Sequence, residues 1–315
     1  MHRKLKLWAA LAATGLAALV GVGAPASAGA ALPVHYGSTA SAESLFAEVY
    51  TPTYVPGAND GCKPSSAHPY PVVLVHATLS DEGSNWVTLA PLLANSGYCV
   101  YAFNYGETGL SDFGRIDALG YIEKSAEELS SFVNKVLSET KASKVDLVGH
   151  SQGGMMPNYY IHFLGGASKV NELVGLAPSN HGTNEDGLVT LLNSFPWAAG
   201  LAHLIEFIGA PSLVQQEEGS AFNEKLFGSG EPLAEGVKYV VIETDHDEVV
   251  TPYTNAFLHG ANVTDILLQE QCPTDPVEHI GMASDSPALQ NVLNELSASP
   301  NPSFKAKCEN FGIDL

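Results

Sequence analysis

Basic residues are scarce in this sequence of 315 residues. Lys and Arg together number 14, whereas Asp and Glu number 34, so the formal net charge is −20. Nucleic acids and anionic membrane surfaces are themselves negatively charged and would repel a protein of this sign. The composition therefore argues against both as partners.

Long hydrophobic runs are nearly absent as well. The one clear run, Leu7–Val22, follows the basic residues Arg3, Lys4 and Lys6 and precedes the small-residue segment Ala26–Ala28. This order predicts a secretory signal peptide over residues 1–28 that is removed after Ala28. A membrane anchor is the alternative, but the run is short and is followed by a processing site. We expect an exported, soluble protein without a stable membrane anchor.

Cysteines are few, and no C-x-x-C motif or Cys/His cluster is present, which argues against a metal site. An even number of cysteines in an exported protein indicates disulfides. Four cysteines allow three pairings, of which we predict the sequential one. The predicted bonds are Cys62–Cys99 and Cys272–Cys308. Neither a metal ion nor an organic cofactor is expected.

Short apolar runs alternate along the chain with segments of helical periodicity, which is typical of a mainly parallel sheet covered by helices. The predicted strands are Pro71–Val75, Cys99–Phe103, Val145–Val148, Leu173–Leu176, Tyr239–Glu243 and Thr264–Leu268. Helical spacing is found for Trp86, Leu89, Leu92 and Leu93, for Leu129, Phe132, Val133, Val136 and Leu137, and from about Pro287 to Leu296.

One long insertion, over about residues 184–232, interrupts this alternation. Its apolar residues recur at helical spacing in two groups: Leu188, Leu191, Leu192 and Phe195, then Leu201, Leu204, Ile205 and Ile208. We predict a cap or lid at the carboxyl edge of the sheet, where ligands bind in such folds. Ordinary core helices are the alternative.

Gly149-His150-Ser151-Gln152-Gly153 fits the G-x-S-x-G pattern of a serine on a sharp turn between a strand and a helix. The pattern is weak alone, but an apolar strand precedes it and a helical segment follows it. A serine hydroxyl also requires a general base, a group that orients this base, and donors for an oxyanion.

The acid and the base of such a triad follow the serine, on loops after later strands. Asp245 and Asp247 both lie after the strand that ends at Glu243, and we favour Asp247 because an apolar segment follows it directly. Among the 11 histidines, His279 lies after the last predicted strand and before the final helix. We therefore predict His279 as the base. Oxyanion donors are expected from the backbone N–H of Gln152 and from Thr78, which follows the first strand.

Four segments in this order, LVHAT, GHSQGGMMPNYY, DEVVTP and EHIGM, resemble the secreted bacterial class 2 lipases of the α/β-hydrolase superfamily. The sequence is also similar to lipase B of Candida antarctica. The resemblance implies an α/β-hydrolase fold, a triad of Ser151, Asp247 and His279, an oxyanion hole of Thr78 and Gln152, and the same sequential disulfides. Ala77 departs from the family, which usually has glycine there, and this could restrict the acyl group.

These observations predict a secreted carboxylic-ester hydrolase that acts on acylglycerols, with an ester or lipid substrate met at a lipid–water interface. A polyesterase or cutinase-like enzyme and an esterase for short soluble esters share the same chemistry, and a peptidase is a more distant alternative. A catalytically silent fold that binds apolar ligands is the alternative from another class. We expect a monomer.

Overall fold

The computed structural model describes residues 30–109, 111, 116–194 and 210–313. The chain divides into a short unit, Met1–Ala31, and a main unit, Leu32–Leu315, to which the fold below belongs. The predicted signal peptide lies outside the described residues. So does the second apolar group of the predicted cap, residues 201–208, together with Phe195.

A sheet of six parallel strands, in the order β2-β1-β3-β4-β5-β6, forms the centre of the main unit. All six predicted strands are present, and β3 and β4 extend beyond their predicted ends. Their bounds are Val72–Val75 (β1), Val100–Phe103 (β2), Val145–His150 (β3), Val170–Leu176 (β4), Lys238–Glu243 (β5) and Val263–Leu267 (β6). The mainly parallel sheet predicted from the sequence is therefore present.

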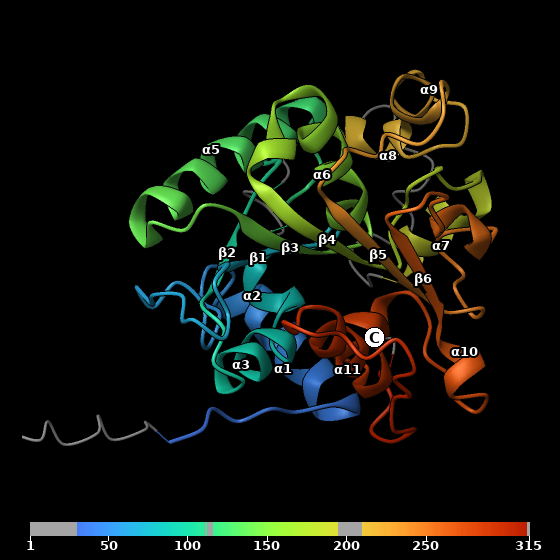
Figure 1. Cartoon of the computed structure of the whole chain (residues 1–315). Coiled ribbons are helices and arrows are strands. Elements are labelled where there is room, and N and C mark those ends of the chain that lie inside the picture. Colours follow the sequence, from blue (N-terminus) through green and yellow to red (C-terminus); the bar gives the residue numbers. More distant parts are fainter. Residues whose placement is uncertain (1–29, 110, 112–115, 195–209, 314–315) are drawn as a thin grey trace, which may run out of the picture. The chain divides into compact units, whose positions relative to one another are not determined.

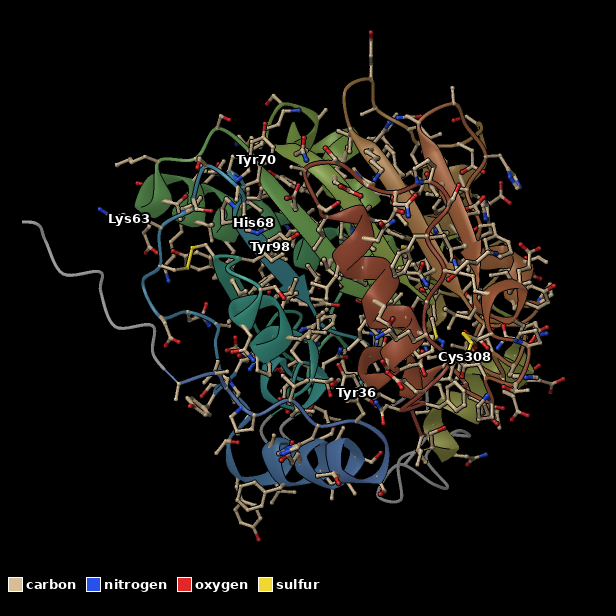
Figure 2. The ribbon with its side chains drawn as sticks, turned by 60° about the horizontal axis from the view of Figure 1, so that its bottom comes forward. Tyr36, Lys63, His68, Tyr70, Tyr98 and Cys308 are labelled. Atoms are coloured by element: carbon tan, nitrogen blue, oxygen red, sulfur yellow. A yellow bond between two sulfur atoms is a disulfide. The ribbon has the colours of Figure 1, made fainter. Side chains whose placement is uncertain are left out.

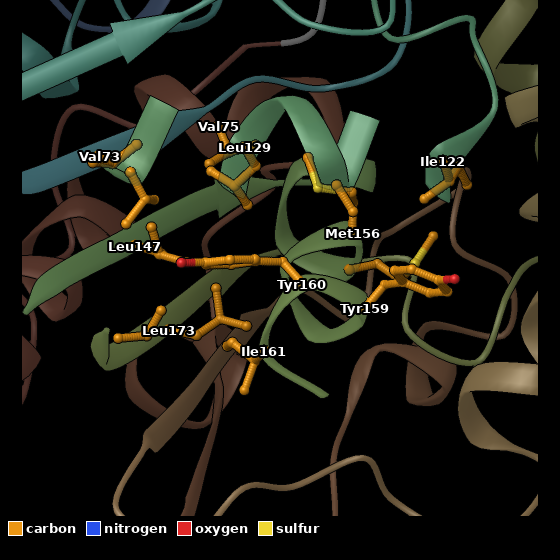
Figure 3. Packing of buried hydrophobic residues seen from close by; sticks show 14 of the residues in the cluster. Val73, Val75, Ile122, Leu129, Leu147, Met156, Tyr159, Tyr160, Ile161 and Leu173 are labelled. Carbon is orange, nitrogen blue, oxygen red and sulfur yellow. The ribbon is translucent and has the colours of Figure 1, made fainter. Parts of the chain in front are cut away.

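Helices cover both faces of the sheet (Figure 1). On one face, Val73 and Val75 pack in a buried cluster with Leu129 of α5 (Ile122–Thr140) and Tyr160 of α6 (Gln152–Phe163), as Figure 3 shows. On the other face, the alternate residues of β1 belong to a second cluster with α3 (Leu89–Asn95) and α11 (Ser286–Glu295). Parallel strands are covered on both sides in this way because successive side chains point to opposite faces.

The remaining helices lie in the connections. They are α1 (Gly37–Tyr50), α2 (Glu82–Asn85), α7 (Glu185–Asn193), α8 (Pro211–Gln215), α9 (Ala221–Phe227) and α10 (Leu268–Gln271). The sequence did not predict α1. The periodic segment around Trp86 is two short helices, α2 and α3, with the buried Trp86 between them. The described part of the predicted cap contains α7, α8 and α9, and its role as a cap stays a prediction.

Both sequential disulfides are formed. Cys62–Cys99 ties an N-terminal loop to the start of β2, with a Cα–Cα distance of 5.4 Å. Cys272–Cys308 ties the end of α10 to the C-terminal segment, where Cys308 is labelled in Figure 2. Among the described helices, none is both long enough and apolar enough to cross a membrane.

Candidate active site

Ser151 lies on a sharp turn at the carboxyl edge of the sheet, between the end of β3 and the start of α6. Its φ of 58° is in the left-handed region, and its backbone N–H donates to the carbonyl oxygen of Leu176, 2.9 Å away. The flanking glycines leave the space that this turn needs. A Cβ on Gly149 would lie 1.8 Å from the carbonyl oxygen of Gly153, and a Cβ on Gly153 would lie 2.0 Å from that of Val75. Side chains at both positions are therefore sterically excluded.

His279 and Asp247 are in contact although 32 residues separate them in the sequence. The Nδ1 of His279 lies 2.7 Å from Oδ2 of Asp247, and both side chains are buried. The other carboxylate oxygen of Asp247 accepts hydrogen bonds from the backbone N–H groups of Val249, at 2.8 Å, and Val250, at 2.7 Å. These three bonds hold the carboxylate in one orientation, in which it can accept a hydrogen bond from the N–H of the imidazole Nδ1.

Asp245, the other acid considered from the sequence, lies elsewhere. It is exposed, and its carboxylate is 3.5 Å from Nδ1 of the neighbouring His246. No hydrogen bond joins it to His279 in the described part of the chain. Of the two acids, only Asp247 therefore reaches His279.

The Nε2 of His279 is buried and has no hydrogen-bond partner among the described residues. The structure thus contains no hydrogen bond between this nitrogen and the hydroxyl of Ser151, whose residue is also buried. In unliganded hydrolases this bond is often long and shortens when substrate is bound. The free nitrogen is the one that a general base requires, since Nδ1 is engaged by Asp247.

His150 connects the loop of His279 to the loop after β1. Its Nε2 lies 2.9 Å from the carbonyl oxygen of His279, and its Nδ1 lies 3.2 Å from Oδ1 of Asn85. The same amide oxygen accepts the backbone N–H of Ala77 at 3.0 Å. These contacts place His150 between the two loops, and because a neutral imidazole carries one N–H, it donates a hydrogen bond to one of the two oxygens at a time. The sequence did not indicate this role for Asn85, since its partners come from distant segments.

Thr78 is buried and accepts two hydrogen bonds. They come from Nε2 of Gln152, at 2.8 Å, and from Nε2 of Gln216, at 3.0 Å. Because its oxygen accepts twice and no acceptor for its proton lies among the described residues, the hydroxyl is left as a donor. Gln216, which follows α8, was missed in the sequence because nothing near it in the chain marks it. Its own amide oxygen is fixed by the hydroxyl of Ser179, 2.9 Å away.

Burial shifts the pKa values of several groups in this region. It lowers the pKa of His76 to about 4 and that of His150 to about 3, so both are neutral near pH 7. Glu243, fully buried at the end of β5, has a pKa well above its ordinary value because of burial and the nearby charge of Asp247. No signal in the sequence identified Glu243 as part of the site.

A cavity of about 50 Å³ adjoins these loops. Thr78, Asn85, His150 and Ile280 line it on the side of the sheet, and α1 closes its other side with Ala40, Ser41, Ser44 and Glu48. Within the described ranges, no cluster of three or more His, Cys, Asp or Glu side chains could hold a metal ion.

Comparison with known proteins identifies the fold as the predicted alpha/beta hydrolase fold. The family model described as the alpha/beta hydrolase fold matches residues 70–202. A triacylglycerol lipase of Pseudarthrobacter phenanthrenivorans is 37% identical over 95 residues, which cover 29% of this chain and 27% of that protein. A triacylglycerol lipase of Burkholderia plantarii is also 37% identical over 95 residues, covering 29% of this chain and 24% of that protein. The match thus spans about a quarter of each relative.

Solved structures extend the likeness in fold. Aspergillus fumigatus lipase B has a TM-score of 0.59 and 21% identity, and the match covers 93% of this chain and 64% of that one. The mature lipase BlEst2 of Bacillus licheniformis has a TM-score of 0.54 and 16% identity, with coverage of 74% and 94%. At these identities the likeness establishes the fold alone.

Proposed function

We propose, from its alpha/beta hydrolase fold, that this chain hydrolyses carboxylic esters through Ser151, His279 and Asp247. The observation that carries the proposal is the buried pair of His279 and Asp247, in which Nδ1 is engaged and Nε2 is free. His279 is also tied through its backbone to His150, the residue that precedes the turn serine.

In the acylation step, the Oγ of Ser151 attacks the carbonyl carbon of the ester while Nε2 of His279 takes the hydroxyl proton. The imidazolium that forms is stabilised by the carboxylate of Asp247, which also keeps Nδ1 protonated. When the tetrahedral intermediate collapses, the bond to the alcohol oxygen breaks, and His279 returns the proton to the leaving alcohol. An acyl-enzyme on Ser151 remains.

The oxyanion of the intermediate would be stabilised by the hydroxyl of Thr78 and by the backbone N–H groups of Thr78 and Gln152. The hydroxyl is suited to this role because its oxygen already accepts hydrogen bonds from Gln152 and Gln216. Each donor of this kind contributes about 3 kcal/mol to lowering the barrier. Water activated by His279 then hydrolyses the acyl-enzyme by the same steps in reverse order.

For the substrate class we favour triacylglycerols, since two relatives named triacylglycerol lipases share 37% identity with this chain over 95 residues. Short soluble esters and polyesters use the same chemistry and are the alternatives. The two disulfides support an exported protein, because such bonds persist in oxidising compartments.

The test is a Ser151→Ala variant assayed with p-nitrophenyl butyrate and with a tributyrin emulsion. We expect kcat to fall by at least about 10⁴-fold on both substrates. A fluorophosphonate probe should label the parent once per chain and leave the variant unlabelled. Ser168→Ala, an exposed serine outside the site, serves as the matched control and should keep parental activity and labelling. Ester cleavage at the parental rate by Ser151→Ala would contradict the proposal.

A further inference from the structure

The helix α1 presents its large apolar side chains to the solvent, unlike an ordinary surface helix. Its exposed residues are Ser38, Thr39, Ala42, Leu45, Phe46, Val49 and Tyr50, none of which is charged. A helix at the surface of a soluble domain usually presents charged and polar residues to water and apolar residues to the core. Here Ser41, Ser44 and Glu48 face inward instead, toward the cavity beside Thr78. We call the exposed side the outer face of α1.

The outer face concentrates exposed apolar side chains. Leu45 is 46% exposed, Phe46 58%, and Tyr50 66%, and Tyr54 just after the helix is 64% exposed. Of the nine large apolar side chains that are exposed in the described part of the chain, five lie on α1 or at Tyr54. The rings of Phe46 and Tyr50 are in contact, with centroids 4.8 Å apart. A contiguous patch of this kind on a soluble protein marks a contact surface.

Position links the outer face to the proposed active site. The helix lies at the periphery of the fold, as the blue helix of Figure 2 shows, and it packs against α2 and the 3-10 helix Ile280–Ser284. These two elements follow the loops that carry Thr78 and His279. Because the inner side of α1 lines the cavity with Thr78 and His150, the outer face is about one helix diameter, or roughly 10 Å, from it.

Charge and composition indicate which contact the outer face makes. The segment from Gly37 to Tyr54 contains no Lys or Arg, so it offers no attraction to anionic headgroups. Its aromatic residues include Tyr50 and Tyr54, and tyrosine rings favour the boundary between an apolar phase and water. Its one partly exposed carboxylate, that of Glu43, is 42% exposed and lies 2.6 Å from Nδ1 of His35. An aromatic-rich face without basic residues, beside an esterase site on an acidic chain, matches an uncharged lipid surface.

We propose that the outer face of α1 docks the enzyme onto the surface of neutral acylglycerol droplets, so that the proposed active site is held close to the lipid. The proposal rests on the proposed function and extends it to the physical state of the substrate. Binding arises from insertion of Leu45, Phe46 and Tyr50 into the lipid surface, where their apolar groups leave water.

The experiment compares Phe46→Ser/Tyr50→Ser with a control that removes two exposed aromatics elsewhere, Tyr121→Ser/Phe163→Ser. Tyr121 is 61% exposed and Phe163 is 41% exposed. Binding to a triolein emulsion is measured by flotation in a Ser151→Ala background, so that no lipid is consumed. We expect the α1 variant to bind at least about tenfold more weakly than Ser151→Ala alone, and the control to bind equally. Phe46→Leu/Tyr50→Phe should bind as the parent does.

Activity provides the second readout. With Ser151 intact, the ratio of the rate on emulsified triolein to the rate on soluble p-nitrophenyl butyrate should fall about tenfold for the α1 variant and stay unchanged for the control. The docking proposal would be overturned if this ratio fell equally for the α1 variant and the control, or if it fell for neither. If the parent is a dimer and the α1 variant is a monomer, the outer face is a contact between two copies, and the docking proposal is overturned as well. If the parent cleaves no soluble ester, the proposed function itself fails.

Discussion

Asp247 and Asp245 differ in their surroundings although they are two positions apart. The carboxylate of Asp247 accepts two backbone N–H groups and contacts His279, all in a buried environment. Asp245 is exposed to water, where its interaction with His246 is weakened by the solvent. A charge that orients and stabilises an imidazolium acts strongly only in the first environment.

Replacing each acid by its amide distinguishes the role of Asp247 from that of Asp245. Asp247→Asn should lower kcat by about 10⁴-fold, because an amide cannot hold the imidazole in the tautomer that frees Nε2 as a base. Asp245→Asn should stay within about twofold of the parent. Both are measured with p-nitrophenyl butyrate near neutral pH, after circular dichroism has shown that each variant is folded. A larger loss in Asp245→Asn would assign the acid to Asp245 instead.

At the scale of elements, the turn between β3 and α6 depends on close contact with β1. The Cβ that Ala would add at position 153 meets the carbonyl oxygens of Val75, at 2.0 Å, and His76, at 2.4 Å. These two carbonyl groups belong to the residues that directly precede the loop of Thr78. Since neither the sheet nor this loop can move away without breaking hydrogen bonds, the clash must displace the turn that carries Ser151.

We therefore expect Gly153→Ala to reduce the free energy of unfolding by about 2–4 kcal/mol and to abolish most ester hydrolysis. Gly109→Ala is the matched control, because a Cβ there meets no atom within 4 Å. It should change the stability by less than about 0.5 kcal/mol. Urea unfolding followed by tryptophan fluorescence measures both. A Gly153→Ala protein with parental stability would show that the turn can relax.

Elements whose sequence pattern matches their burial could be predicted, and those that break the pattern could not. The strands β1 and β2 are continuous apolar runs because both of their faces are covered. The helix α1 escaped prediction because its apolar residues face outward while Ser41 and Ser44 face the cavity. Its sequence therefore lacks the contrast between sides on which helix recognition depends.

The candidate site shows the same division. Ser151, Asp247 and His279 could be proposed from the sequence because the fold places triad residues on successive loops in a fixed order. Gln216 and Asn85 could not, since each is recruited through hydrogen bonds with Thr78 or Ala77, far away in the sequence. Such partnerships arise only when the chain folds and leave no local motif.

At the scale of the whole molecule, acidic residues are buried as well as abundant. Burial raises the pKa of several carboxyl groups, an effect that disfavours their charged form. The affected groups are Asp81, Glu82, Asp146, Glu172 and Asp285, with pKa values of about 7, and Asp117, with a pKa of about 6. In the unfolded chain these groups have ordinary pKa values near 4.

Stability should consequently fall as the pH rises. Between about pH 4 and pH 7 the folded protein binds more protons than the unfolded chain, so the free energy of unfolding decreases with pH over this interval. Below pH 4 both states are protonated and the contribution of these groups is fully present, whereas above pH 7 it is lost. Urea unfolding at pH 5 and pH 8 should give the larger free energy at pH 5.

Repulsion among the excess surface acids, with a net charge of −20, also grows with pH and must be separated from burial. Added salt at 0.5 M screens exposed charges but has little effect on buried ones. The decrease of the free energy of unfolding with pH, referred to below as the slope, should therefore largely persist in 0.5 M salt. Asp146→Asn should make the slope shallower, because its carboxyl is buried and an amide can preserve the contact with Asn171, now 2.8 Å. Asp186→Asn, which removes an exposed acid, is the control and should leave the slope in 0.5 M salt unchanged. If salt abolishes the slope and Asp146→Asn does not alter it, surface repulsion and not burial governs the dependence of stability on pH.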